Sequence, residues 1–399
     1  MSNYKFKYPF LGIGNRLKKD DIEILFDVAE KATTYTQGRF QNEFEKNFKE
    51  KFNLKHVLAV SNAASGIELI ADELNINDKD EVLCPAHTYC ASAYPFLKRG
   101  AKIKWIDIDP KSWLSELEQL ENQITEKTKA IILVHLYGTP AEASLLYEKL
   151  NKKNIFIIED CAQSLGAKTN NELVGTKADF AIFSFQSHKN ISTLGEGGII
   201  ATRHKESFLR MKRQRHNGHT TYEVFKDKYW KPAMSDVLKV YPDFFPSNFC
   251  LNEFSCAMGT HLLSKYDLIL KKRKLKYDLA STFFEEKNNF SMQYIADYKS
   301  SAYHLLPIQL KTKNIKQIDN IIHCMANEYG VQLAKQYMPL YRYKLFNNEA
   351  TGFGDDKLLT NTDNFYDSMV SIPFHGELTE EDIFYQINSL VKSFQICTQ

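Results

Sequence analysis

The segment Ala181–Thr202 reads AIFSFQSHKNISTLGEGGIIAT and predicts two buried strands joined by a polar, glycine-rich turn. Its two ends, Ala181–Phe185 and Gly198–Thr202, are continuous apolar runs of strand length without the alternation of a half-exposed strand. Such runs are typical of strands that are buried on both faces of a mostly parallel sheet. The turn between them places serine, histidine and lysine side chains where the first strand ends.

Apolar runs of the same kind alternate with helical segments through the first half of the chain. Strands that alternate with helices are joined by right-handed crossovers, which produce a mostly parallel sheet covered by helices on both faces. We therefore expect an α/β fold. The other expected strands are His56–Ser61, Glu81–Cys84, Lys102–Ile106, Ala130–Val134 and Asn154–Ile158, and the expected helices include Ser65–Leu74, Trp113–Gln123 and Ala141–Lys152.

The alternation of strands and helices weakens after about residue 215. Residues 219–247 are aromatic and irregular, which predicts a loop or a hairpin. A long helical pattern then runs from about Asn252, YHLLPIQL predicts a strand, and TEEDIFYQINSLVKSF predicts a final helix that begins at a threonine cap. We expect a large α/β domain at residues 10–250 and a smaller α+β domain at residues 251–399.

The composition excludes several classes of protein. The 399 residues include 51 Lys and Arg against 49 Asp and Glu, and this balance removes the electrostatic reason to expect a nucleic-acid partner. The seven scattered cysteines argue against a disulfide framework or a metal site and favour a reducing compartment. The N-terminus does not resemble a signal peptide, and no apolar stretch approaches the ~18 residues of a membrane helix. We expect a soluble, cytoplasmic protein with no membrane partner. The lysine-rich run Leu270–Lys276 predicts a solvated helix face.

Polar residues follow three of the expected strands, at the edge of the sheet where open α/β folds bind their ligands. Asn62–Gly66 opens a helix with small residues, which is either an anion site or a plain helix entry. Asp160 is a candidate helix cap, ion-pair member or ligand group. At Lys189, desolvation would lower the pKa and make the neutral amine a nucleophile suited to Schiff-base formation with a carbonyl. The alternative for Lys189 is a solvent-exposed loop lysine.

Together these motifs resemble one family, the DegT/DnrJ/EryC1/StrS family of pyridoxal-phosphate-dependent aminotransferases, often called sugar aminotransferases. The matching segments extend from about residue 10 to about residue 390 and stand in the family's order. They include VSNAASGIEL, CPAHTYCASA, VHLYGTPAE, IIEDCAQSLGA, FSFQSHKNISTLGEGG, SNFCLNE and QYMPLY. The resemblance implies the aspartate-aminotransferase fold (fold type I), with a three-layer α/β/α large domain and a smaller α+β C-terminal domain. It also implies pyridoxal 5'-phosphate as the cofactor.

The resemblance implies a role for each residue that would contact the cofactor ring. Lys189 would hold the cofactor as a Schiff base and later move protons as a general acid and base. Asp160 would pair with the pyridinium nitrogen and keep the ring an electron sink. Gln163 would contact the ring hydroxyl or support Asp160, and Tyr89 would stack on the ring, although a core tyrosine is the alternative.

The resemblance also implies how the cofactor phosphate is bound. Ser184 and the backbone amides of Ala63 and Ala64 would bind it, and Asn248 would reach it from a neighbouring subunit. The active site would then be shared between the two subunits of a homodimer. The family usually has Gly-Thr where this chain has Ala63-Ala64, so one threonine hydroxyl is missing and Ser65 is the candidate replacement.

Two residues are candidates for contact with the substrate. His188 adjoins the lysine, and Tyr337 lies in a segment that is near the substrate in relatives; the alternatives are a loop histidine and a packed core tyrosine. The family's usual arginine near the substrate is Cys250 here, which leaves recognition of the donor and the acceptor open. The candidate substitutes for this arginine are Arg39, Arg215 and Arg342.

The function implied by the resemblance is transfer of an amino group from an amino acid, expected to be L-glutamate, to a nucleotide-linked keto-sugar in polysaccharide or glycan biosynthesis. The Cys250 departure keeps a small phosphorylated or cyclic ketone open as the acceptor. The family's dehydratase branch has histidine at the lysine position, and a non-catalytic sensor would have lost Lys189 or Asp160; both residues are present. A nucleotide-binding dehydrogenase would need GxGxxG after the first strand, where SNAASG stands.

Overall fold

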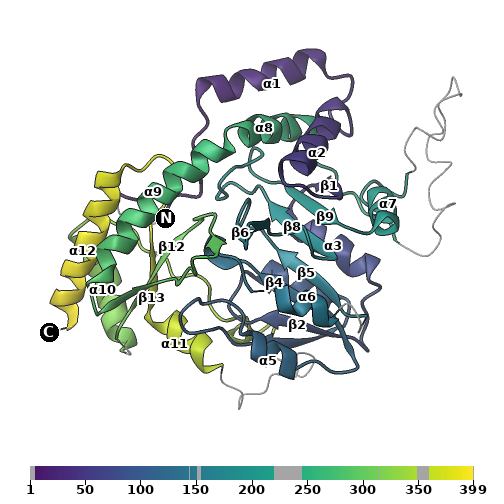
Figure 1. Ribbon diagram of the computed structural model, residues 1–399. Coiled ribbons are helices and arrows are strands. Elements are labelled where there is room, and N and C mark those ends of the chain that lie inside the picture. Colours follow the sequence, from purple (N-terminus) through teal and green to yellow (C-terminus); the bar gives the residue numbers. More distant parts are fainter. Residues whose placement is uncertain are drawn as a thin grey trace, which may run out of the picture.

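A seven-stranded sheet lies at the centre of the computed structural model, which describes residues 5–142, 144–150, 154–219, 245–312, 314–347 and 359–398 (Figure 1). The strand order is β1-β9-β8-β5-β4-β2-β3. Strand β9 runs antiparallel to both of its neighbours, and the other pairs are parallel, so the predicted mostly parallel sheet is confirmed. Its strands are β1 (His56–Val60), β2 (Glu81–Pro85), β3 (Lys102–Ile106), β4 (Thr128–Val134), β5 (Phe156–Asp160), β8 (Phe180–Ser184) and β9 (Gly198–Thr202).

Helices cover both faces of this sheet because successive side chains of a strand point to opposite faces. In β1, Leu58 and Val60 pack into a core with α3, while Val57 and Ala59 pack into a second core with α2 and α8. All four side chains are buried, which explains the continuous apolar run. The helices around the sheet are α1 (Lys19–Lys31), α2 (Arg39–Lys51), α3 (Ala63–Glu73), α4 (Tyr94–Lys98), α5 (Leu117–Asn122), α6 (Ser144–Leu150), α7 (Lys205–Gln214) and α8 (Glu253–Ser264), with the short helices η1 (Cys90–Ser92) and η2 (Leu136–Gly138).

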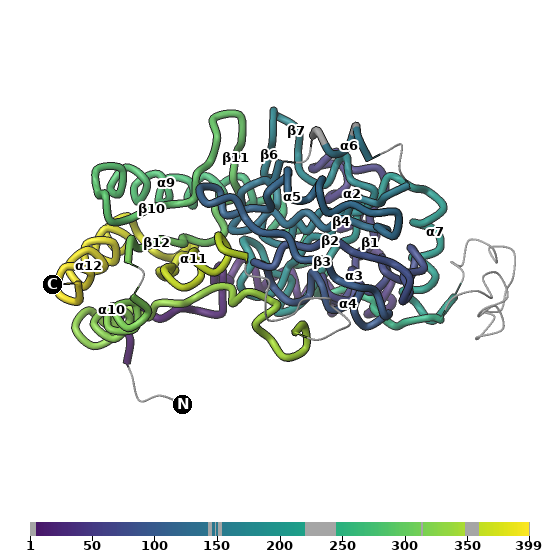
Figure 2. The backbone as a smooth tube through the Cα atoms, turned by 90° about the horizontal axis from the view of Figure 1, so that it is seen from below, coloured from purple at the N-terminus to yellow at the C-terminus, as the bar shows by residue number. Residues whose placement is uncertain are grey.

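A second, three-stranded antiparallel sheet in the order β10-β12-β13 lies at one end of the molecule (Figure 2). It shares a separate apolar core with α9, α10 and α12. The predicted boundary at residue 250 stays a prediction, and the packing of α8 on α2 favours a boundary closer to Lys265. The remaining elements are β6 (Lys168–Thr169), β7 (Glu172–Leu173), α9 (Tyr266–Glu285), β10 (Phe290–Met292), β11 (Lys299–Ser300), β12 (Leu306–Leu310), α10 (Ile315–Asn327), η4 (Leu340–Arg342), α11 (Thr360–Ser368), β13 (Met369–Ile372) and α12 (Glu380–Thr398).

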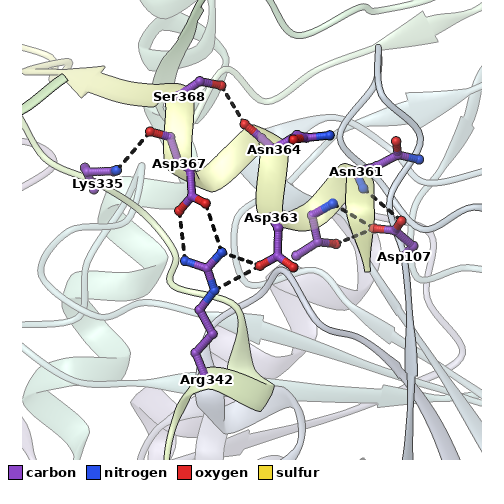
Figure 3. A network of polar contacts seen from close by, with 9 residues as sticks. Asp107, Lys335, Arg342, Asn361, Asp363, Asn364, Asp367 and Ser368 are labelled. Carbon is purple, nitrogen blue, oxygen red and sulfur yellow. Dashed lines mark hydrogen bonds and ion pairs between the residues drawn. The ribbon is translucent and has the colours of Figure 1, made fainter. Parts of the chain in front are cut away.

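A buried carboxylate joins α11 to the large sheet (Figure 3). Asp107 follows β3, and its side chain accepts N–H groups of Asn361 at 3.0 Å and of Thr362 at 2.7 Å. These amides lie in the first turn of α11, which has no intrahelical partners for them and carries a partial positive charge. Asp107 therefore caps a helix that is more than 250 residues away in the sequence. Among the described helices, none is long and apolar enough to cross a membrane.

Several of the predicted elements are wrong in detail. The helix expected at Trp113–Gln123 begins only at Leu117. The Asp109 side chain accepts the backbone N–H groups of Lys111 and Ser112, and these bonds form a turn in place of the first part of the helix. Trp113 has a φ of 56° and cannot be helical. The long helical pattern after Asn252 is two helices that meet at Lys265. Most of the loop predicted at residues 219–247 lies outside the described residues.

The lysine-rich run on α9 is not a uniformly solvated face, which corrects the prediction. Lys271, Lys272 and Lys274 are exposed, but Arg273 and Lys276 are buried. The ammonium group of Lys276 donates to three backbone carbonyl oxygens of residues 375–378, at 2.8–3.2 Å. Backbone carbonyls thus replace the water that these cations lose on burial.

Candidate active site

The predicted site residues gather at the carboxyl ends of β5 and β8 and at the start of α3. Asp160, the last residue of β5, is in register with Ile182 of β8. Ser184, the last residue of β8, is in register with Gly198 of β9, and Gly198 is in register with Val60 of β1. This register brings residues from four separate stretches of sequence to one edge of the sheet, as expected for a ligand site in an open parallel sheet.

The start of α3 lies beside these strand ends and offers backbone amides of the kind that bind anions. Its first amides belong to Ala63 and Ala64, positions that an α-helix leaves without intrahelical partners. A Cβ on Gly198 would lie 2.8 Å from the nitrogen of Ala63, so only glycine lets β9 approach this helix start. Ser65 does not replace the missing threonine hydroxyl, because its hydroxyl accepts from the Asn62 amide at 3.2 Å and donates to the Asn62 carbonyl at 2.9 Å.

Asp160 is held in place by two donors. The hydroxyl of Ser92 donates to one carboxylate oxygen at 2.6 Å, and the amide of Ala162 donates to the other at 3.0 Å. Ser92 is fully buried and its oxygen lies 3.0 Å from the hydroxyl of Thr88. We had not predicted Ser92 from the sequence; its place three residues after Tyr89, in the segment that resembles the family, is the signal that would have found it.

Lys189 lies in the turn after β8, where its amide donates to the carbonyl oxygen of Gln186 at 2.8 Å. Burial of the ammonium group lowers the pKa of Lys189 from 10.5 to about 8, although the negative charges of Asp160 and Glu196 act in the opposite direction. A larger fraction of neutral amine is therefore present near neutral pH than in an exposed lysine. Glu196 was not predicted; it stands in the GEGG turn seven residues after Lys189.

A buried hydrogen-bond network joins Gln163 to the segment that precedes η4. The Gln163 side chain accepts the N–H of Tyr137 at 2.7 Å and donates to the hydroxyl of Tyr337 at 3.0 Å. The rings of Tyr337 and Tyr89 meet edge to face with centroids 5.9 Å apart. Tyr89 is 58% exposed, so its ring has a free surface for stacking and is not a core tyrosine.

The remaining predicted residues lie at the edge of the site. His188 is exposed beside Lys189, and burial of part of its ring together with the charge of Lys189 lowers its pKa. Asn248 is exposed on a segment that bonds to the end of α7 and to Ser61, whose amide donates to Phe249 at 2.8 Å. This exposure leaves the Asn248 side chain accessible to a neighbouring molecule.

Each candidate substitute for the family arginine is already paired with a carboxylate. Arg215 is buried and donates to Glu45 at 2.9 Å. The guanidinium of Arg342 binds two carboxylates of α11, those of Asp363 and Asp367 (Figure 3). Arg39 donates to Glu43 at 2.6 Å on the exposed surface of α2. None of the three presents an unpaired cation where Cys250 stands.

The donor set at this edge of the sheet fits pyridoxal 5'-phosphate. The start of α3 and Ser184 suit a phosphate, because helix N-termini attract anions. Asp160 supplies a negative charge for a pyridinium nitrogen, and Lys189 supplies an amine for an aldehyde carbon. The close approach of Gly198 to Ala63 places the end of β9 directly beside the start of α3.

Two solved structures share the fold of this chain. Spr1654, described as a putative sugar aminotransferase from Streptococcus pneumoniae, matches with a TM-score of 0.89 and 23% identity, covering 98% of this chain and 100% of that one. Helicobacter pylori PseC, an aminotransferase involved in pseudoaminic acid biosynthesis, matches with a TM-score of 0.86 and 24% identity, covering 97% and 99%. The fold and the site define a pyridoxal-phosphate-dependent aminotransferase of fold type I.

The chain belongs to the DegT/DnrJ/EryC1/StrS aminotransferase family, whose model matches residues 15–391. It is 31% identical over 369 residues to the UDP-4-amino-4,6-dideoxy-N-acetyl-beta-L-altrosamine transaminase of Campylobacter jejuni, covering 92% of each chain. It is 26% identical to the GDP-perosamine synthase of Escherichia coli O157:H7, covering 79% of this chain and 80% of that protein. The predicted family, fold type and cofactor are confirmed.

Proposed function

We propose that this aminotransferase moves an amino group from L-glutamate to a nucleotide-linked keto-sugar, in the cytoplasm, for the synthesis of a surface polysaccharide or glycan. The observation that carries the acceptor class is the 31% identity over 92% of the chain to a transaminase named for a UDP-linked amino sugar. Another relative is named for a GDP-linked amino sugar. A third, 23% identical over 95% of this chain, is the spore coat polysaccharide biosynthesis protein SpsC of Bacillus subtilis.

The proposed roles of the residues follow from their positions. Pyridoxal phosphate, when bound, supplies an electron sink that stabilises negative charge on the carbon that loses a proton. Lys189 would hold the cofactor covalently and, as a free amine, would take the proton from the α-carbon of the donor. Asp160 keeps a proton on the pyridine nitrogen, Gln163 and Tyr89 orient the ring, and Ser184 with the start of α3 holds the phosphate.

The acceptor class is tested with a panel of ketones. The purified enzyme, loaded with pyridoxal phosphate, is incubated with glutamate and either UDP- and GDP-linked keto-sugars or small phosphorylated and cyclic ketones. We expect amino-group transfer, detected by mass spectrometry, to at least one nucleotide-linked sugar. Transfer only to the small ketones would overturn the proposed acceptor class. Alanine and aspartate in place of glutamate test the donor in the same assay.

We further propose a homodimer in which Asn248 of one subunit reaches the cofactor phosphate of the other, with His188 and Tyr337 close to the substrate. The exposure of the Asn248 side chain beside the end of α7 supports its proposed contact with the neighbouring subunit. Mixing Lys189→Ala and Asn248→Ala subunits tests the sharing, because each mixed dimer contains one site without either substitution. After unfolding and refolding together, the mixture is expected to regain about a quarter of the wild-type rate, since half the dimers are mixed and carry one intact site of two. Mixtures no more active than the separate variants would contradict the shared site.

Ser92→Ala is expected to reduce kcat by about 10- to 100-fold, because a hydrogen bond to a charged group contributes about 1.5–3 kcal/mol. Loss of this donor at 2.6 Å leaves one oxygen of the Asp160 carboxylate without its hydrogen bond and loosens the hold on the carboxylate. Ser92→Thr keeps the hydroxyl and is the matched control. The measurement is kcat together with the pH dependence of the bound cofactor's absorbance, which a purely structural role of Ser92 would leave unchanged.

A further inference from the structure

The N-terminal residues 12–15, Gly-Ile-Gly-Asn, lie directly against the turn that carries Lys189. The amide of Gly14 donates to the carbonyl oxygen of Ser187 at 2.8 Å. The side-chain amide of Asn15 donates to the carbonyl oxygen of Asn190. We call residues 12–15 the N-terminal strap. Its hydrogen bonds reach the residues on either side of His188 and Lys189, so it fixes both ends of this dipeptide.

Only glycine fits at the centre of the strap. A Cβ on Gly14 would overlap the carbonyl oxygen of Lys189 and would lie 2.7 Å from the carbonyl oxygen of His188. Both contacts are with backbone atoms, which cannot rotate away as a flexible side chain can. Any side chain at Gly14 must therefore displace the strap or the peptide units of residues 188–189.

Residues from the C-terminal half of the chain donate hydrogen bonds to the other side of the strap. The carbonyl oxygen of Gly14 accepts the amide of Gly376 at 3.0 Å and the guanidinium of Arg273 at 3.4 Å. Arg273 is 1% exposed and also donates to the carbonyl oxygens of Tyr303 and His304, both at 3.1 Å. Arg273 extends from α9, so its bond to Gly14 joins the N-terminal segment to this helix. The strap therefore lies between the guanidinium group of Arg273 and the turn that carries Lys189.

We propose that the N-terminal strap is a positioning element for Lys189, which holds the peptide of this residue against the sheet and keeps its side chain partly out of water. This inference rests on the proposed role of Lys189 as the residue that holds the cofactor. Gly14 is a positioning residue, since it touches the backbone of Lys189 and no reacting atom. Its displacement would let water reach the ammonium group and would misdirect the amine.

The test is Gly14→Ala, measured first on the cofactor-free protein. Competitive labelling with acetic anhydride across a pH series reports the pKa of the Lys189 amine, which is about 8 in the native environment against 10.5 in water. We expect the midpoint to rise by about one pH unit or more, because hydration favours the charged amine. The titratable groups that face Lys189 are unchanged in this variant: Asp160, His188, Glu196 and His304.

The second measurement is the retention of pyridoxal phosphate in equilibrium dialysis. Gly14→Ala is expected to lower it by about tenfold or more, because misplacement of a catalytic group by about 1 Å is costly. A wild type that fails to bind pyridoxal phosphate would overturn the proposed function, whereas the labelling midpoint would still decide the effect of the strap on Lys189. An unchanged midpoint in folded Gly14→Ala overturns the inference.

Gly330→Ala is the matched control. A Cβ there would lie 3.2 Å from the backbone nitrogen of Lys7, so it strains the same N-terminal segment at a point away from Lys189. Its φ of 64° adds strain of its own. We expect a lower melting temperature with an unchanged Lys189 midpoint; an equal shift in both variants also overturns the inference. If Gly14→Ala does not fold, Asn15→Ala decides, since it removes the donor to Asn190 without adding atoms and is expected to raise the midpoint.

Discussion

Replacing Lys189 with alanine is expected to reduce the rate of amino-group transfer by about 10⁴-fold, because in the proposed mechanism this one side chain supplies both the covalent attachment and the proton transfer. The low pKa of about 8 means that the native amine is a competent nucleophile near neutral pH, and alanine offers no substitute. The variant should also lack the yellow colour of the lysine-linked cofactor. The measurement is the keto acid released from the amino donor per mole of folded protein, with pyridoxal phosphate in excess.

Lys299→Ala is the matched control for this prediction. The Lys299 side chain is 9% exposed, donates to the carbonyl oxygen of Pro140 at 3.1 Å and lies 3.4 Å from Glu142. It is therefore a partly buried, paired lysine outside the proposed site. Its loss should lower the melting temperature but preserve the colour and the rate. A yellow, active Lys189→Ala protein would exclude Lys189 as the residue that holds the cofactor.

The strands could be predicted well because their signal is local. Lys102–Ile106 and Gly198–Thr202 have the same bounds in the sequence prediction and in the structure. The helix expected at Trp113 failed because a turn at Asp109, set by side-chain-to-backbone hydrogen bonds, replaces the helix start. The spacing of apolar residues alone does not show where side-chain hydrogen bonds compete with the start of a helix.

The residues that support the site could not be predicted in the same way, because their partners are distant in the sequence. Ser92 contacts a carboxylate 68 residues away, and Gly14 approaches a turn about 175 residues away. Arg273 and Lys276 belong to a lysine-rich run for which the sequence predicts a solvated face. Both are buried, and both donate hydrogen bonds to backbone carbonyl oxygens of other segments. Burial of a cation depends on acceptors that only the tertiary fold supplies.

Asp160→Asn is expected to lower kcat by about 10²- to 10⁴-fold, the equivalent of the about 3–5 kcal/mol that breaking a buried charge pair costs. Asparagine has nearly the shape of aspartate, and its oxygen can still accept the Ser92 hydroxyl. The variant therefore removes the charge and keeps the contact with Ser92, while the Ala162 amide loses its acceptor. In the proposed mechanism, loss of this charge would leave the pyridine nitrogen of a bound cofactor unprotonated, and the ring would withdraw electrons less strongly. The measurement is kcat, taken after the variant has been shown to bind as much cofactor as the wild type.

Two comparisons decide whether the charge itself is the cause. Asp179 is a buried carboxylate at the opposite end of the same strands, where it accepts the amide of Ile157 at 2.8 Å and binds Arg203. Asp179→Asn should lower stability and leave kcat unchanged, since the site lies at the other edge of the sheet. Asp160→Asn loaded with a cofactor methylated on the ring nitrogen should regain part of the lost rate, because the methyl group makes the positive charge permanent. A full wild-type rate in Asp160→Asn with the ordinary cofactor would show that the carboxylate charge does not act on the ring.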